Sequence, residues 1–348
     1  MLRRMNELKN NLKVAMLTTW RVKCGVASYA ENLARALSEN GVDIYVVRIP
    51  RFGQKSSDVF NNVVASIPAD KVDLIHVQNE YGLIQHLEPH LYRSLKALGK
   101  PIVSTMHAVG MWMNDRVVDE YSDRIIVHNE FCFKRFKFHE KLGIIPHGAT
   151  VQTTPSPPKE ESKKSIGISP KIPIVGYLGF IGEYKGLESL LEAIVKVPNA
   201  ALLIGGGWHI SEETPYSVTL KEWTLRTLPG RCHWLGYVSD ENLRTVYAAM
   251  DLVVYPSMYS TESGALIMAL SHGKAVITSN IPPFKEKEKV GALTTFKNID
   301  DLARKIKQLL KNKDKRQALE EGALKYCRSV SWNEIAKRHI ALYEELCG

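Results

Sequence analysis

The stretch that decides the fold is Ile174-Val-Gly-Tyr-Leu-Gly-Phe-Ile-Gly-Glu-Tyr-Lys-Gly-Leu-Glu-Ser-Leu-Leu-Glu-Ala-Ile194. Its apolar run at 174–178 is too short for a helix and predicts a buried strand. From Leu187 to Ile194 the apolar residues recur at helical spacing, with glutamates on the opposite face, which predicts an amphipathic helix. A glycine-containing turn at 179–186 must therefore join a strand to a helix.

This turn has the features of an anion-binding site. A strand-to-helix turn with glycines presents backbone N–H groups and the positive end of a helix dipole at one point. Lys185 stands where the helix begins, and a cation is unfavourable there unless a negative ligand is bound. A loop with a solvated lysine is the plainer alternative, which the turn by itself leaves open.

The composition indicates a globular protein of two domains. A chain of 348 residues is too long for one ordinary core, and 45% apolar with 24% charged residues is typical of globular proteins. No stretch approaches the ~18 consecutive apolar residues of a membrane span. The net charge of +9 is spread over both halves, which favours phosphorylated ligands or an anionic membrane surface over nucleic acid. Five widely spaced cysteines without a Cys-x-x-Cys pair favour the reducing cytoplasm and argue against a zinc site.

Strands and helices alternate along both halves of the chain, which predicts two doubly wound parallel sheets. A segment rich in proline, serine and mixed charge at 152–172 interrupts the alternation and is typical of a linker. We therefore expect an N-terminal Rossmann-like domain at 1–158, a C-terminal Rossmann-like domain at 159–331, and a final segment at 332–348.

Ligands of open α/β sheets bind beyond the carboxyl ends of the strands, so two such domains predict a ligand cleft where they face each other. A nicotinamide-dependent dehydrogenase is the obvious rival class. However, no Gly-x-Gly-x-x-Gly sequence occurs at any predicted strand-to-helix junction.

Several short motifs follow one another in a fixed order over both halves. They are Cys24-Gly25-Val-Ala-Ser-Tyr-Ala-Glu-Asn-Leu33, Gln78-Asn-Glu-Tyr-Gly82, Thr105-Met-His107, Ile145-Pro-His-Gly148, Gly179-Phe-Ile-Gly-Glu-Tyr-Lys-Gly186, Gly236-Tyr-Val238, Glu262-Ser-Gly-Ala265, Ala269-Leu-Ser-His-Gly-Lys-Ala-Val-Ile277 and Ser331-Trp332. With these motifs in this order, the chain resembles the retaining glycosyltransferases of family 4, which have the GT-B fold. The resemblance covers nearly the whole chain. It also implies that the final segment packs back onto the first domain.

The resemblance implies a hexosyltransferase that takes a hexose from a UDP- or GDP-sugar without a metal or other cofactor. Such a transfer releases a diphosphate with growing negative charge, which preorganised donors must stabilise. Lys185 would be the cation, and His107 would lie beside the transferred sugar. His147 would shape a loop without being catalytic. Further donor contacts are implied for Gly25, Gly182, Val238, Glu262, Ser263, Gly264 and Ala265. Gly206, within three successive glycines after a predicted strand, suggests a close backbone approach to the donor, although a plain turn is an equal alternative.

Two positions depart from the pattern of the family. Many members carry an arginine at the position of Phe180, where it would share the diphosphate with Lys185. Many also carry two glutamates eight residues apart, and these positions hold Ser260 and Met268, so that Glu262 is displaced by two. We therefore expect Lys185 to act on the diphosphate almost alone.

The residues that would contact the acceptor, the molecule that receives the sugar, are less well defined. Glu80 and Tyr81 are candidates for contacts with acceptor hydroxyls, although a helix-capping role for Glu80 is an equal alternative. Residues 131–141 interleave four phenylalanines with four basic residues, which fits either an ordinary amphipathic helix or a peripheral membrane contact. The acceptor is accordingly expected to be a glycan or a lipid-linked molecule.

Two other functions stay open at this point. An epimerase of the same fold would act on the nucleotide sugar itself and would need a carboxylate acid/base pair near the sugar. A non-catalytic protein that binds nucleotide sugars would fit the two departures from the family pattern.

Overall fold

The computed structural model describes residues 11–51, 53–207 and 214–348, which divide into two compact units. The first unit consists of the chain up to Gly148 together with Trp332–Gly348, and the second is Ala149–Ser331. Each unit is built around its own sheet.

The sheet of the first unit is parallel in all its described pairings, in the order β2-β1-β3-β4-β5-β6. Its central strands are buried on both faces, as expected for a parallel sheet covered by helices. The strands are β1 (Lys13–Thr18), β2 (Asp43–Arg48), β3 (Leu74–Asn79), β4 (Ile102–Met106), β5 (Arg124–Val127) and β6 (Leu142–Ile144).

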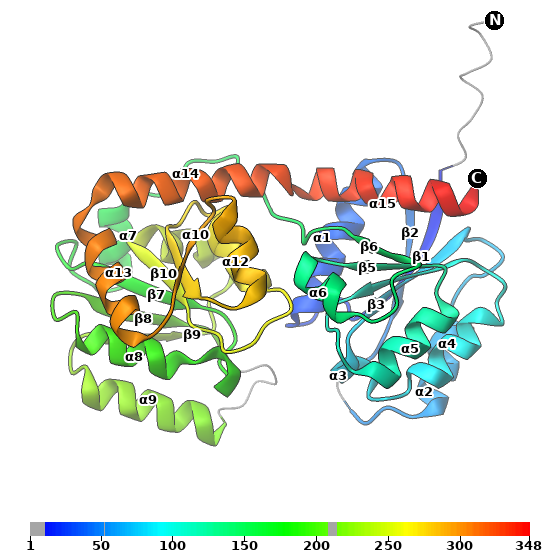
Figure 1. Ribbon diagram of the computed structural model, residues 1–348, viewed down its shortest axis with the longest axis horizontal. Coiled ribbons are helices and arrows are strands. Elements are labelled where there is room, and N and C mark those ends of the chain that lie inside the picture. Colours follow the sequence, from blue (N-terminus) through cyan, green and yellow to red (C-terminus); the bar gives the residue numbers. More distant parts are fainter. Residues whose placement is uncertain (1–10, 52, 208–213) are drawn as a thin grey trace, which may run out of the picture. The chain divides into compact units, whose positions relative to one another are not determined.

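Helices cover both faces of this sheet. In Figure 1, α2, α4 and α5 lie together on one side, while α1 and α15 lie on the other. The contact between α1 and α15 matters because it brings the last residues of the chain to the first sheet. The helices are α1 (Gly25–Glu39), α2 (Ser57–Ala65), α3 (Tyr81–Ile84), α4 (Glu88–Lys96), α5 (Trp112–Tyr121), α6 (Glu130–Arg135) and α15 (Trp332–Cys347).

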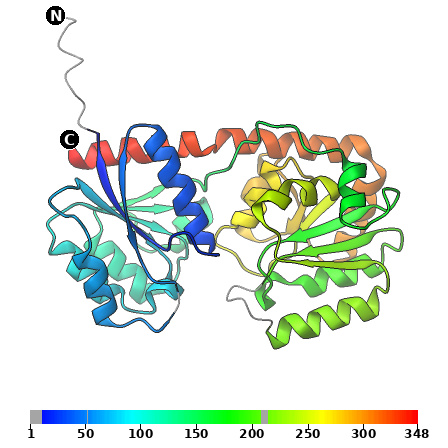
Figure 2. The ribbon, with the colours of Figure 1, turned by 180° about the vertical axis from the view of Figure 1, so that it is seen from behind.

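The second unit contains another parallel sheet, in the order β12-β11-β10-β7-β8-β9. The quoted stretch supplies its central strand, β7, which is buried throughout. Figure 2 shows the same sheet from behind, between its two layers of helices. The strands are β7 (Ile174–Leu178), β8 (Ala201–Gly205), β9 (Cys232–Gly236), β10 (Leu252–Tyr255), β11 (Val276–Ser279) and β12 (Thr294–Phe296).

The helices of the second unit include the one predicted after the glycine turn. It is α8, which buries five of its nine residues and packs against α13. The helices are α7 (Lys159–Ser165), the short 3-10 helix η1 (Glu183–Lys185), α8 (Leu187–Val195), α9 (Pro215–Thr227), α10 (Asp240–Ala249), α11 (Gly264–Ser271), α12 (Pro282–Lys289), α13 (Ile299–Lys311) and α14 (Lys313–Ser329).

The predicted fold class is confirmed, because both units are doubly wound parallel sheets of the Rossmann type. The strand order of each sheet also identifies its switch point, the crevice where successive connections turn in opposite directions. This crevice lies between β1 and β3 in the first unit and between β7 and β10 in the second. Ligands are expected at these two places.

The predicted linker at 152–172 is wrong in part. Residues 159–165 form α7, which packs against α10. The structure also divides the chain at Gly148, ten residues before the expected boundary at 158. Residues 149–158 lie on the second unit because Ala149 pairs with Ser331 and Arg244 donates to the carbonyl of Pro155.

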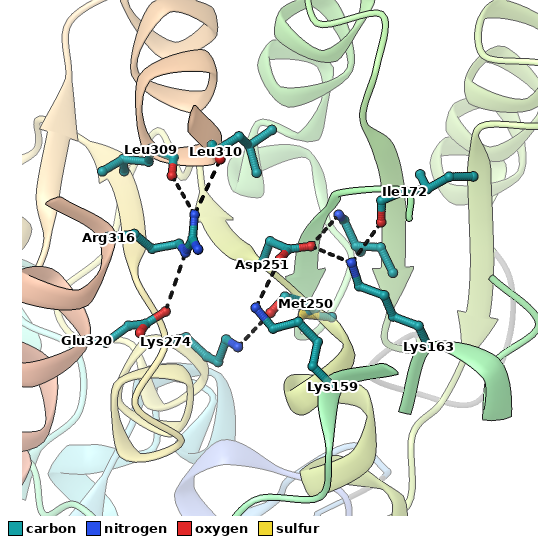
Figure 3. A network of polar contacts seen from close by, with 11 residues as sticks. Lys159, Lys163, Ile172, Met250, Asp251, Lys274, Leu309, Leu310, Arg316 and Glu320 are labelled. Carbon is teal, nitrogen blue, oxygen red and sulfur yellow. Dashed lines mark hydrogen bonds and ion pairs between the residues drawn. The ribbon is translucent and has the colours of Figure 1, made fainter. Parts of the chain in front are cut away.

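A partly buried carboxylate explains why α7 is part of the second unit. Asp251, which precedes β10, accepts hydrogen bonds from Lys163 Nζ at 2.8 Å and Lys159 Nζ at 3.0 Å (Figure 3). It also accepts the amide of Ile174, the first residue of β7, at 2.9 Å. Burial alone would raise the pKa of Asp251, but these partners hold that pKa below its ordinary value. This side chain therefore connects α7 to the amino edge of the sheet, opposite the edge where ligands are expected.

We predict that Asp251→Ala lowers the free energy of unfolding by about 3 kcal/mol, because it leaves the buried Lys163 without its carboxylate. Asp300→Ala, which breaks the exposed pair with Lys196, is the matched control and should cost less than about 1 kcal/mol. Urea denaturation at neutral and acidic pH measures both variants. Because the folded pKa of Asp251 is depressed, its contribution is present at neutral pH and lost as the pH falls through that folded pKa. Equal effects of the two variants would contradict this role.

Candidate active site

In the second unit, the loops after β7 and β10 flank the switch point. The loop after β7 is the quoted turn at 179–186, and the loop after β10 runs from Pro256 to Ser263, where α11 begins. The side chain of Tyr255 joins the two loops, because its hydroxyl lies 2.9 Å from the carbonyl of Leu178 and 2.8 Å from that of Ala265. The structure thus brings the predicted turn and the predicted helix start together.

Two glycines allow these loops to approach closely. Gly186 has a φ of +63°, and a Cβ atom there would lie 2.5 Å from the carbonyl oxygen of Pro256. Gly206, at the end of β8, has a φ of +146°, and a Cβ atom would lie 1.8 Å from the carbonyl oxygen of Gly179. Val238 belongs to the same group, since its side chain lies beside Gly205. Gly182 is the residue before η1 and has an extended backbone.

Lys185 brings a positive charge to the carboxyl edge of this sheet. Its Nζ lies 4.6 Å from the centre of the Tyr184 ring. Among the residues that the structure describes, none forms a hydrogen bond or an ion pair with this ammonium group. Burial lowers the pKa of Lys185 from 10.5 to about 8. A partly desolvated ammonium without a carboxylate is energetically unfavourable, and an anion would relieve that cost.

The start of α11 supplies unsatisfied N–H groups at the same edge. Ser263 is the N-cap, and its hydroxyl accepts the amide of Leu266 at 3.2 Å. The amides of Gly264 and Ala265 lie in the first turn, where the helix itself offers no backbone carbonyl to accept their hydrogen bonds. No acidic residue lies in that turn. Ser263 thus caps the helix, while the amides of the two following residues are available to an anion.

Glu262 was expected to contact the sugar donor, but its carboxylate points to a partner within the protein. Its carboxylate forms an ion pair with Lys287 of α12 at 2.8 Å and accepts the amide of Ser263 at 2.9 Å. Both side chains are about 95% buried, with 4% and 5% exposure. Burial alone would lower the pKa of Lys287, but the carboxylate of Glu262 raises it above its ordinary value. This pair fixes the loop before α11, so Glu262 positions the helix start.

In the first unit, three histidines follow three neighbouring strands. His107 comes directly after β4, His128 after β5, and His147 shortly after β6. Their rings surround Tyr29 of α1, at centroid distances of 4.8, 5.2 and 5.1 Å. Burial, followed by the neighbouring imidazoles, holds the pKa of His107 well below its ordinary value. His107 is therefore a neutral hydrogen-bonding group at physiological pH.

A chain of hydrogen bonds orients His107. Its Nε2 lies 2.9 Å from Oε1 of Gln78, whose Nε2 lies 3.2 Å from Nε2 of His76. Nδ1 of His76 in turn lies 2.7 Å from the hydroxyl of Tyr343 in α15. An amide that accepts from one imidazole and donates to the next requires the proton of His107 on Nε2 and that of His76 on Nδ1. The last helix thereby contributes to the orientation of His107.

The other predicted residues of the first unit have partly structural roles. Glu80 is the N-cap of α3 and accepts the amide of Leu83 at 3.1 Å, as the capping alternative proposed. Tyr81 donates its hydroxyl to Asp115. Gly25 is the first residue of α1, where a Cβ atom would meet nothing within 4 Å, so neither crowding nor φ explains the glycine. Open space at a helix start suits the approach of a ligand.

Three residues of this edge were missed by the sequence analysis. Gln78, Tyr29 and His128 were not among the predicted site residues. A signal for Gln78 was present, because β3 carries three polar side chains although it is buried along its whole length. Buried polar groups need partners, so such a strand predicts an internal network.

Residues 158–326 match the model of the family described as "Glycosyl transferases group 1". The chain is 26% identical over 192 residues to the uncharacterized glycosyltransferase MJ1607 of Methanocaldococcus jannaschii, covering 52% of this chain and 47% of that protein. It is 24% identical over 287 residues to the lipopolysaccharide 1,2-N-acetylglucosaminetransferase of Salmonella typhimurium, covering 76% and 73%. Several of the curated relatives are thus matched over only about half of their length.

Among solved structures, HepE of Anabaena in complex with UDP and glucose superimposes with a TM-score of 0.80. Its sequence identity is 16%, and the match covers 97% of this chain and 100% of that chain. The fold is therefore GT-B, the class with two Rossmann-like domains. Within the second unit, residues 158–326 are similar to the group 1 glycosyltransferases.

We predict that Gln78 fixes the tautomer of His107. Long-range ¹H–¹⁵N spectra of the imidazoles should show the His107 proton on Nε2, with a pKa well below the ordinary value. Gln78→Leu should produce a mixture of tautomers, whereas Gln78→Glu should raise the pKa of His107 by adding a carboxylate. The spectrum of His107→Gln identifies the imidazole signals of His107, because they are absent from that variant. A proton on Nδ1 in the unmodified protein, or a pKa unchanged by Gln78→Glu, would contradict the proposed network.

Proposed function

We propose that this protein is a retaining glycosyltransferase of family 4. In this proposal, it transfers a hexose from a nucleotide diphosphate sugar, with UDP or GDP as the nucleotide, to a glycan or a lipid-linked acceptor. The reaction is proposed to require no metal or other cofactor and to take place in the cytoplasm. The cytoplasmic assignment rests on the five widely spaced cysteines. Among the residues that the structure describes, no helix is long and apolar enough to cross a membrane.

The observation that carries this proposal is the ammonium group of Lys185. It lies at a switch point, within the residues that match the group 1 glycosyltransferase model, and lacks an ionic partner among the described residues. An enzyme that expels a nucleoside diphosphate needs positive charge where the leaving group becomes negative. A partly buried cation is more effective there than one in water, since the effective dielectric constant is lower.

The other groups of the same edge have complementary roles in the proposal. The amides of Gly264 and Ala265 donate to the phosphate oxygens, and the ion pair of Glu262 holds their helix in place. Val238 meets the nucleotide base through its backbone, and Gly206 lets the segment after β8 approach the turn proposed to hold the donor. Because Phe180 stands where many members carry an arginine, Lys185 carries most of the positive charge.

On the first unit, His107 is proposed to orient the hydroxyls of the transferred sugar. A neutral imidazole with a fixed tautomer can donate or accept a hydrogen bond without bringing a charge to the oxocarbenium-like sugar. Tyr81 and Glu80 contribute on the acceptor side through their place after β3. The amides at the start of α1, from Gly25 onward, add to the stabilisation of the phosphates.

The epimerase alternative is less well supported. It needs a carboxylate poised for proton transfer at the sugar. Glu262 is committed to Lys287, and Glu80 to the start of α3. Incubation with the nucleotide sugar alone distinguishes the two functions, because an epimerase would convert it in the absence of any acceptor.

We predict that Lys185→Ala lowers turnover by on the order of 100-fold or more, because the leaving diphosphate loses its cation. Lys185→Arg keeps a charge and should be less affected, while Lys307→Ala removes an exposed lysine of the same unit and serves as the control. Calorimetry with UDP-, GDP- and ADP-sugars first identifies the donor, and turnover is then measured with that donor. Turnover of Lys185→Ala within a few-fold of the unmodified protein would remove Lys185 from the mechanism.

A further inference from the structure

A shallow pocket in the first unit combines positive charge with exposed apolar side chains. Its volume is about 360 Å³, and it lies between the segment after β4 and helix α6. Both segments leave the carboxyl edge of the sheet, the edge that carries His107. The pocket is lined by Gly110, Trp112, Asp115, Phe131, Lys134, Arg135 and Lys137.

The charge of the lining is positive. Lys134, Arg135 and Lys137 are all exposed, and no ion pair within the described part of the chain joins either lysine to a carboxylate. Asp115 is the acidic residue of the lining, but its oxygens accept the hydroxyl of Tyr81 and the amide of Gly110. Three cations therefore face a pocket whose carboxylate is already hydrogen-bonded.

The apolar component is a run of three large side chains. Met111, Trp112 and Met113 have exposures of 39%, 51% and 68%. The guanidinium of Arg116 lies 5.8 Å from the centre of the Trp112 ring, which adds a fourth cation beside them. Contiguous exposed apolar side chains next to cations are typical of surfaces that enter the headgroup layer of a membrane, where tryptophan is favoured.

Phe131 lines the pocket, but the phenylalanines of residues 131–138 are not among the exposed apolar side chains of this surface. Phe136 is fully buried, and Phe131, Phe133 and Phe138 pack against the core of the first unit. The amphipathic-helix alternative is therefore correct for the aromatic residues, while the basic residues stay exposed. The exposed apolar side chains come instead from a segment that the sequence analysis had not singled out.

We propose that this surface, defined by Met111–Met113 and the three basic residues of the pocket, binds the phosphate headgroups of anionic membrane lipids. The cations neutralise the phosphates, and the two methionines with Trp112 enter the interface. Charge complementarity supports this occupant, because a pocket with three cations and an apolar rim matches a phosphate attached to acyl chains. The inference does not depend on the transferase reaction, since it concerns the unmodified chain and a bilayer.

The test compares vesicles that contain phosphatidylglycerol with vesicles of pure phosphatidylcholine, at low and high salt. We expect binding only to the anionic vesicles, and weaker binding at high salt. Lys134→Gln with Lys137→Gln should lower the partition coefficient about 30-fold, because each charge near an anionic surface contributes about fivefold. Lys307→Gln with Lys311→Gln in α13 removes two exposed charges from the other unit and should leave the partition coefficient nearly unchanged.

A second measurement tests the apolar component. Brominated lipids should quench the tryptophan fluorescence of the bound protein, and Trp112→Phe should abolish that quenching while binding persists. Met111→Ser with Met113→Ser should weaken binding, whereas Leu225→Ser on α9 should not. Circular dichroism melting confirms that each variant is folded.

Three results would overturn the proposal. These are equal and negligible binding to both kinds of vesicle, equal losses in the pocket and control variants, and complete displacement by glycerol phosphate without quenching by brominated lipids. The last result would identify a site for a soluble phosphate. None of them bears on donor binding, which is measured separately by calorimetry.

Discussion

Each sheet is parallel, so all of its strands end at one edge, and the loops that leave them are brought together there. This constraint explains why residues far apart in the sequence form each candidate site. In the second unit it places Lys185, the start of α11 and the Glu262–Lys287 pair around one switch point. In the first unit it places three histidines around Tyr29. What each edge can do then depends on how its charges are paired.

The two edges differ in this respect. In the second unit, the carboxylate of Glu262 is paired with Lys287, whereas the ammonium of Lys185 has no ionic partner among the described residues. That asymmetry favours a negative ligand. In the first unit, His107 is neutral because burial holds its pKa well below the ordinary value, and a hydrogen-bond network orients it. The first edge is thus suited to hydroxyl groups and the second to phosphates, a division that agrees with a glycosyl donor and its transferred sugar.

Most of the fold could be predicted from the sequence, because strands, glycine turns and amphipathic helices leave local patterns. The turn before α8 is the clearest case, since one stretch contains the strand, the glycines, the lysine and the helix. Helix α7 was missed because its sequence is polar and its stability depends on Asp251, which lies 88 residues from Lys163. The partner of Glu262 was missed for the same reason, because a tertiary contact decides it. The network of Gln78 ends at Tyr343, which no local pattern could reveal.

Lys185 is a partly desolvated cation at the carboxyl edge of the second sheet, which an anion would stabilise. The most direct measurement is the NMR titration of its side-chain ammonium, assigned with Lys185→Arg, in the free protein and with the nucleotide sugar selected by calorimetry. The structure predicts a pKa of about 8 in the free protein and a higher value in the complex, because a bound diphosphate favours the charged form. An ordinary lysine pKa near 10.5 that does not change on binding would contradict this account.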